Sequence, residues 1–248
     1  MARQERVQYE GAFYHVMSRG NDKKKVFVDD NDRWRFLKIL GKVVKESGLL
    51  CHGYCLMGNH YHLFLETPDG NLSNGMQRLN SWYCHYFNSM HGKVGHVMQG
   101  RFKSFIVDDD DYLFRLLRYL CLNPVKDGFV GAPEHWRWSS YSAIAGLSRV
   151  PPFLDTSFTL ALFSNDPQCA KEEFRSFIAE GMIDAREISD RKQLLKSLFE
   201  GVFDKHERDV AVRSAHEQYG FEVEEIAAYL GVHRTTISRN ILKSCKSA

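Results

Sequence analysis

The chain has 248 residues, of which 44% are hydrophobic and 26% charged, and this is the composition of an ordinary globular protein. Its 33 Lys and Arg nearly balance its 31 Asp and Glu, so a net charge of +2 excludes a uniformly basic coat but allows a local basic patch. Long apolar runs and an N-terminal signal core are both missing from the sequence, so we expect no membrane association. The six Cys form no C-x-x-C pair and favour a reducing, cytoplasmic compartment.

Strand and helix patterns alternate along the first part of the chain. Gly48 follows an amphipathic run as a helix stop, and Gly58-Asn59 between two strand-like runs indicates a hairpin. Pro124 is expected to close the last of these helices. The predicted elements are a strand at 12–19, a helix at 32–47, strands at 49–57 and 60–67, a helix at 72–90, a short strand at 105–107 and a helix at 110–123.

Composition divides the chain into three regions. Residues 1–145 carry the strand patterns, residues 146–157 contain a Pro-Pro pair typical of a linker, and residues 158–248 show only helical periodicity. For the first region we predict an α+β fold with one antiparallel sheet and helices on one face. For the last region we predict an all-α structure.

The first chemical motif is His60-Tyr61-His62 within a predicted strand. Residues two apart on a strand point to the same face, so both imidazoles should lie side by side at a spacing suited to one metal ion. Two His with an oxygen ligand suit Mg²⁺ or Mn²⁺, and Zn²⁺ is a further possible occupant. The alternative is a His pair that only forms hydrogen bonds across the sheet.

The second motif places Tyr119 and Asn123 on one face of the helix predicted at 110–123. An amide oxygen can complete a two-His metal site, and a phenol beside a bound phosphate can act as a nucleophile. The structural alternatives are a packing Tyr and a helix cap before Pro124. Tyr112 is the rival nucleophile, but its neighbour four residues on is Leu116, which cannot bind a metal.

Together these residues resemble the HUH nucleases with a single catalytic tyrosine, and among them the REP-associated tyrosine transposases. The resemblance covers roughly residues 5–145. It is carried by YHVMSRGN (14–21), GYCLMGNHYHLFLET (53–67), QGRFKSFIVDDDDYLFRLLRYLCLNPVKDG (99–128) and WRWSSY (136–141).

The resemblance implies a fold, a cofactor and a reaction. The fold would be a ferredoxin-like antiparallel sheet, and His60, His62 and Asn123 would bind Mg²⁺ or Mn²⁺. Tyr119 would attack a phosphodiester of single-stranded DNA to give a 5′-phosphotyrosine link and a free 3′-hydroxyl. The substrates implied are REP-type DNA hairpins, acted on by a monomer or homodimer.

Two segments are candidates for DNA contact. Arg101 and Lys103 flank Phe102, a combination suited to the charge and bases of single-stranded DNA, and Arg19 ends the first predicted strand. The alternative is an ordinary solvated loop. Near 222–242 the pattern predicts a helix-turn-helix that could contact duplex DNA, with a plain helical hairpin as the alternative. Its second helix would present Arg234, Thr235, Ser238 and Arg239.

Three other functions remain open. An HUH relaxase or replication initiator would use the same chemistry, but the chain has no P-loop and no second Tyr beside Tyr119. A non-catalytic regulator would bind DNA through the helix-turn-helix alone. A zinc-stabilised structural protein would bind metal without cleavage, although Cys51 and Cys55 are interpreted as core thiols.

Overall fold

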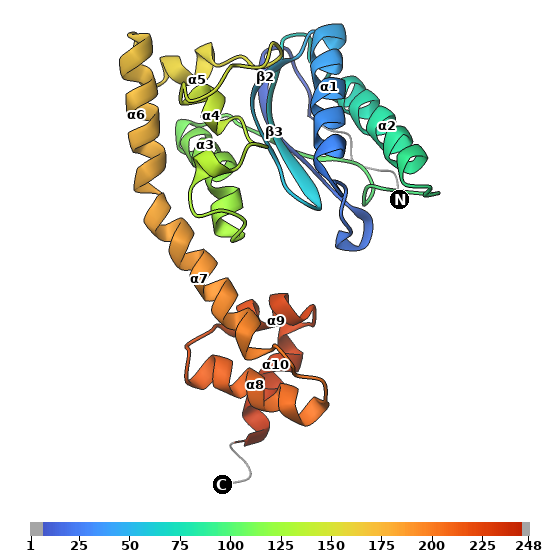
Figure 1. The fold of residues 1–248 in the computed structure, drawn as a ribbon, viewed down its shortest axis with the longest axis vertical. Helices are drawn as coiled ribbons and strands as arrows, with labels where there is room; N and C mark the ends of the chain where they lie inside the picture. The colour runs from blue at the N-terminus through green and yellow to red at the C-terminus, as the bar shows by residue number, and fades with distance from the viewer. Residues whose placement is uncertain (1–6, 245–248) are drawn as a thin grey trace. The chain divides into compact units, whose positions relative to one another are not determined.

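The structure is a computed structural model that describes residues 7–244, and it divides into two compact units, Met1–Ala185 and Arg186–Ala248 (Figure 1). The first unit contains the sheet and most of the core. Its elements are β1 (Ala12–Arg19), α1 (Asp30–Ser47), β2 (Leu50–Leu56), β3 (His60–Thr67), α2 (Leu72–Met90), β4 (Lys103–Ile106), α3 (Asp110–Lys126), α4 (Tyr141–Ile144), α5 (Ser157–Ala161) and α6 (Pro167–Glu180), with 3-10 helices at Asn21–Lys23 and Pro133–His135.

The four strands form one antiparallel sheet in the order β2-β3-β1-β4. This confirms the predicted α+β class with an antiparallel sheet. Helices α1 and α2 lie on one face of it (Figure 1). Tyr61, Leu63 and Leu65 of β3 are fully buried there, because alternate residues of a strand share a face.

Helix α3 packs on the opposite face, so helices cover both faces rather than only one. Its leucines form a second apolar cluster with Cys55, Met57 and Phe64 of the hairpin. Phe64 belongs to the same strand face as His60 and His62, and this cluster therefore holds α3 beside the two histidines. The leucines are Leu113, Leu116, Leu117 and Leu120.

Helix α3 continues beyond the predicted stop at Pro124. A proline lacks an N–H and so removes one helical hydrogen bond, yet the last turn is closed by the backbone N–H of Asp127, which donates to the carbonyls of Asn123 and Val125. Asn123 consequently lies inside the helix and is not its cap.

The predicted linker at 146–157 does not coincide with the boundary between the two units. That boundary lies after Ala185, within α7 (Met182–Leu198). Leu154 pairs with Cys51 at the edge of the sheet, and the backbone N–H of Asp155 donates to the Cys51 carbonyl at 2.8 Å. Phe174 and Ile178 of α6 are fully buried in the main core. The Pro-Pro segment thus follows the sheet edge, and α5 and α6 belong to the first unit.

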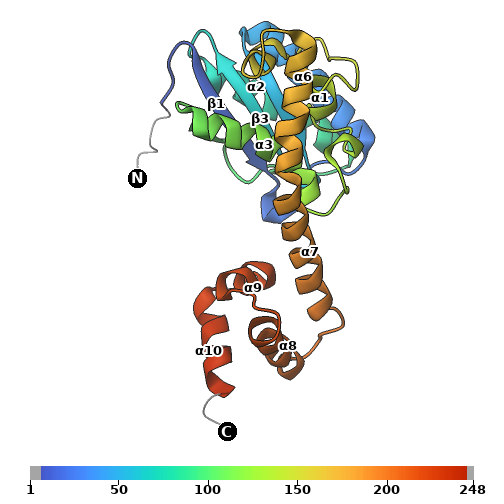
Figure 2. The same cartoon turned by 90° about the vertical axis from the view of Figure 1, so that its left-hand side faces the viewer.

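The second unit is helical, as predicted for this region. A small core that includes Leu195, Ile226 and Ile237 holds it together, and Gly231 adopts a left-handed conformation at the turn between its last two helices (φ 68°). Val232, the residue after this turn, is 39% exposed. The elements, seen in Figure 2, are α7 (Met182–Leu198), which carries the division, α8 (Lys205–Glu217), α9 (Val223–Leu230) and α10 (Arg234–Ser244). No helix in residues 7–244 has the length and apolar character needed to cross a bilayer.

Candidate metal and nucleophile site

The two histidines of the H-x-H motif lie side by side on β3. His60 pairs with Arg19 and His62 with Met17 of β1, so both side chains project from the sheet face that α3 covers. Their ring centroids are 4.9 Å apart and the rings are nearly perpendicular. His62 is buried, whereas His60 is partly accessible at the open end of the strand.

Helix α3 brings Tyr119 directly to this pair. The Tyr119 hydroxyl lies 3.1 Å from Nε2 of His62, and the two rings meet edge to face at 4.9 Å between centroids. Asn123 follows one helical turn later and is 4% exposed. Strand β3 and helix α3 therefore bring together the four residues selected from the sequence, with the Tyr119 oxygen facing Nε2 of His62.

Burial keeps both imidazoles neutral and makes the phenol harder to ionise. The pKa of His60 is lowered to about 4 by burial, and the pKa of His62 falls well below its usual value for the same reason. The pKa of Tyr119 is raised, first by burial and then by the charge of Asp127, while the nearby Asn123 amide acts in the opposite direction. An activating group is thus required before Tyr119 becomes a good nucleophile.

The donor set fits a hard divalent cation. Neutral imidazoles are the metal-binding form of histidine, and the amide oxygen of the buried Asn123 is a hard ligand. In the described part of the chain no three His, Cys, Asp or Glu side chains gather at ligand distance. Cys51 is buried, and burial raises the pKa of its thiol to about 12, so it remains a core thiol.

The buried histidines should make the first unit sensitive to acid. The pKa of His15 is 6.5 when unfolded and about 4 in the fold, again through burial. Below pH 6.5 the unfolded chain therefore binds more protons, and the free energy of unfolding falls as the pH falls toward 4. Between pH 6.5 and pH 5 we expect His15 alone to account for a loss of about 2 kcal/mol.

This loss can be followed by urea unfolding at pH 7 and pH 5 in the presence of a chelator. Tryptophan fluorescence reports the first unit selectively, and the His15→Gln variant should lose less stability over this pH interval than the native chain. Equal losses in the two proteins would contradict the assignment. The four tryptophans are Trp34, Trp82, Trp136 and Trp138.

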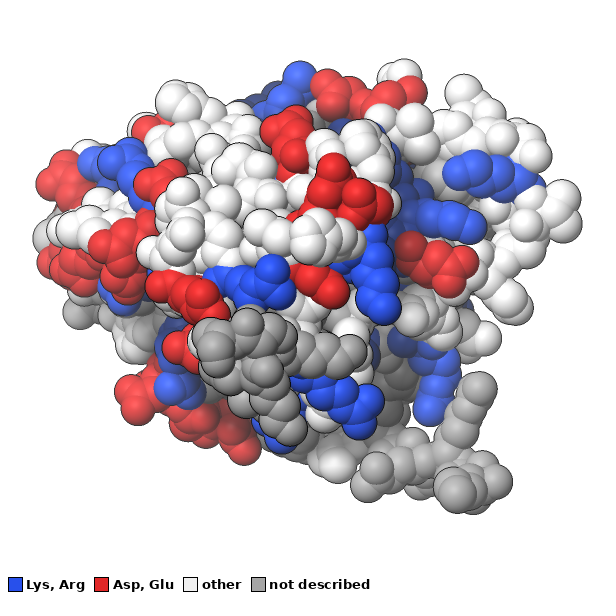
Figure 3. Space-filling view, turned by 90° about the horizontal axis from the view of Figure 1, so that it is seen from below, with Lys and Arg blue, Asp and Glu red and all other residues white. Residues whose placement is uncertain are grey.

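The basic residues predicted to contact DNA in the first unit lie around the His60 end of the sheet. Arg19 is exposed opposite His60, and the backbone N–H of Gln99 donates to its carbonyl at 2.7 Å, so the loop leading to Arg101 starts there. Lys103 pairs with Met17, the residue that also pairs with His62. Basic and acidic side chains are interspersed on the face seen in Figure 3. A DNA contact would therefore involve small local groups of basic residues.

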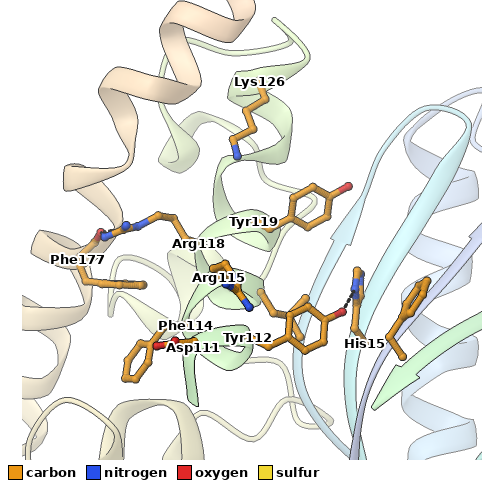
Figure 4. A pocket seen from close by; sticks show the side chains of 11 residues that line it. His15, Asp111, Tyr112, Phe114, Arg115, Arg118, Tyr119, Lys126 and Phe177 are labelled. Carbon is orange, nitrogen blue, oxygen red and sulfur yellow. Dashed lines mark hydrogen bonds between the residues drawn. The ribbon is translucent and has the colours of Figure 1, made fainter. Parts of the chain in front are cut away.

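The structure adds residues that the sequence did not indicate. A pocket of about 710 Å³ beside Tyr119 is lined by Tyr112, Arg115 and Lys126 of α3 and by His15 of β1 (Figure 4). The Lys126 ammonium lies 5.9 Å from the centre of the Tyr119 ring. Arg115 and Lys126 stand four residues before and seven after Tyr119, a helical spacing that could have placed them on its face. The position of His15 beside this pocket could be known only from the register of β1 against β3.

In the second unit α10 carries the residues predicted for the recognition helix. Arg239 is exposed, whereas Arg234 forms an ion pair with Glu224 at 3.2 Å. Thr235 accepts or donates a hydrogen bond with Nδ1 of His233 at 2.9 Å, and the Ser238 hydroxyl donates to the Arg234 carbonyl. Of the four residues predicted to contact DNA, Arg239 therefore has the side chain most available for binding.

Residues 8–121 match the family model described as transposase IS200 like. A curated protein of Haemophilus influenzae named as a REP-associated tyrosine transposase is 30% identical over 98 residues, which are 35% of this chain and 56% of that protein. The match thus spans little more than half of this relative.

A solved structure of a REP-associated tyrosine transposase bound to a REP hairpin has the same fold in its matched part. It aligns with a TM-score of 0.51 at 17% identity, over 63% of this chain and 94% of the other. The aligned fold and the family match agree with the motifs that carry the resemblance. Residues 8–121 are therefore similar to the IS200-like transposases, and the chain resembles the REP-associated tyrosine transposases.

Proposed function

We propose that the protein is a metal-dependent single-stranded DNA endonuclease and strand transferase that forms a 5′-phosphotyrosine intermediate. The observation that carries this proposal is the Tyr119 hydroxyl at 3.1 Å from His62, with the His60 ring beside it. Arrangement of a nucleophile beside metal-binding groups is what phosphoryl transfer requires.

In the proposed reaction these side chains have separate roles. Attack by Tyr119 forms a bond between its oxygen and the phosphorus, while the bond from phosphorus to the 3′ oxygen breaks. The phenol proton is released and the 3′ oxygen takes up a proton. His60, His62 and Asn123 would hold Mg²⁺ or Mn²⁺, which when bound polarises a phosphate oxygen and stabilises the developing charge.

The DNA strand would approach over the pocket and the end of β1. Arg115 and Lys126 line the pocket, and Phe105 of β4 is 48% exposed at its wall, where a base can stack. Arg19 of β1 and Lys103 of β4 offer further positive charge near the histidine pair. REP-type hairpins are the substrates that the resemblance to REP-associated transposases favours.

The proposal is tested by incubating the full chain with labelled single-stranded DNA carrying a hairpin repeat and Mn²⁺. A denaturing protein gel should show a labelled covalent adduct that disappears with chelator. Tight binding without any adduct would instead favour a regulator that contacts DNA through α9 and α10. Bound Zn²⁺ without DNA cleavage would favour a structural metal site.

The basic residues at the end of the sheet should contribute sequence-independent affinity. We expect Arg19→Ala and Lys103→Ala each to weaken binding of single-stranded DNA and to reduce the slope of log K against log salt by about 0.7. Lys42→Ala is the matched control, because Lys42 lies on α1 at the other face of the sheet. Salt titrations by fluorescence anisotropy measure the slopes, and equal slopes for all variants would exclude this contact surface.

A further inference from the structure

Tyr119 and His62 belong to a longer line of hydrogen-bonding groups. Nδ1 of His62 lies 3.0 Å from Nε2 of His15, and Nδ1 of His15 lies 3.1 Å from the Tyr112 hydroxyl. The line starts at one phenol of α3, crosses β3 and β1 through two imidazoles, and returns to a second phenol of the same helix. Figure 4 shows its last link, between His15 and Tyr112. Every nitrogen of both rings is therefore engaged.

Only two arrangements of hydrogens satisfy this line with neutral rings. In the first, Tyr119 donates to His62, His62 donates from Nδ1 to His15, and His15 donates from Nδ1 to Tyr112. In the second, each hydrogen bond runs in the opposite direction: Tyr112 donates to His15, His15 donates to His62, and His62 donates to Tyr119. The first leaves a lone pair on Nε2 of His62, whereas the second places a hydrogen there and prevents it from binding a cation.

The proposed ligand role of His62 requires the first arrangement, because only that arrangement leaves Nε2 of His62 without a hydrogen. Tyr112 lines the pocket, so its hydrogen can go to water while its oxygen accepts from His15.

We infer that His15, supported by Tyr112, is a positioning residue that fixes the His62 tautomer with hydrogen on Nδ1, so that the lone pair of Nε2 accepts from Tyr119 until a cation takes its place. This inference rests on the proposed function for the role of the cation. It assigns Tyr112, the alternative nucleophile, a separate task, because its hydroxyl faces His15 and not the H-x-H pair. His15 is 8% exposed, and a purely apolar side chain there would leave His62 Nδ1 without its partner.

The first test measures the tautomer itself, without metal or DNA. Two-bond ¹H–¹⁵N correlation spectra of the full chain, labelled at histidine and assigned with His62→Gln, should show the His62 hydrogen on Nδ1. His15→Phe, which removes the acceptor but keeps a ring, should shift His62 to a mixture of tautomers. His15→Gln, whose amide oxygen can accept the same hydrogen, should restore the native pattern. A hydrogen on Nε2 in the native chain, or no change in His15→Phe, would overturn the inference.

The second test measures Mn²⁺ binding by calorimetry. We expect His15→Phe to weaken Mn²⁺ affinity about 10- to 100-fold, Tyr112→Phe to weaken it less, and His15→Gln to recover most of the loss. Unchanged affinity in His15→Phe would also contradict the positioning role. A native chain that shows the expected tautomer but binds no Mn²⁺ would contradict the proposed function while supporting the role of His15.

Discussion

Replacement of Tyr119 by Phe should abolish the covalent protein–DNA adduct and lower strand cleavage by at least about 10³-fold. The substitution removes the only atom that forms the bond to phosphorus, and no other hydroxyl lies against His62 among the described residues. The edge-to-face contact of the ring with His62 can be kept by phenylalanine, so the fold should be unaffected. Adduct formation is measured with end-labelled hairpin DNA, Mn²⁺ and a denaturing gel.

Tyr86→Phe provides a matched control for this experiment. Tyr86 lies on α2, on the other face of the sheet, and its removal should leave the adduct yield unchanged. An adduct that persists in Tyr119→Phe would make Tyr112 the nucleophile and would refute the assignment of Tyr119. Mapping the labelled peptide distinguishes the two tyrosines directly.

Replacement of His62 by Ala should weaken Mn²⁺ binding by at least about 100-fold and reduce cleavage in parallel. His62 is the inner of the two imidazoles and contacts both Tyr119 and His15, so its loss removes a metal ligand and leaves both of these groups without their partner. Calorimetric titration with MnCl₂ measures the affinity. Circular dichroism establishes whether the variant remains folded.

The control for this substitution is His85→Ala. His85 is an exposed histidine on α2 and has no place in the site, so Mn²⁺ affinity should equal that of the native chain. If His62→Ala binds Mn²⁺ as tightly as His85→Ala, the ion does not bind at the H-x-H motif. Any dependence of DNA cleavage on Mn²⁺ would then come from a metal site elsewhere.

Local patterns were enough to predict the elements that build the site. The strand at 12–19, the strand at 60–67 and the helix at 72–90 are observed with the predicted bounds, because each shows one clear period and ends at residues that favour turns. The side-by-side placement of His60 and His62 followed from the two-residue period of a strand. These features depend only on residues close together in the sequence.

Features that depend on distant residues could not be predicted in this way. The role of His15 arises from the register of β1 against β3, and nothing in the sequence around residue 15 states which residue of another strand it meets. The Pro-Pro segment has the composition of a linker, yet Leu154 is buried beside Cys51. In both cases tertiary packing overrides what the local composition indicates. The DNA-binding role of α9 and α10 remains a prediction.

The contact between α6 and α3 also limits how this fold can vary. The Arg118 guanidinium, one residue before Tyr119, donates to the Phe177 carbonyl at 2.8 Å and forms an ion pair with Glu180 at 3.0 Å. A Cβ at Gly181 would lie 2.5 Å from Cδ of Arg118 and 2.9 Å from Cδ1 of Leu122, so a larger residue there would displace side chains of α3. A substitution on either side of this contact therefore requires a compensating change on the other helix, and α3 can vary only together with α6.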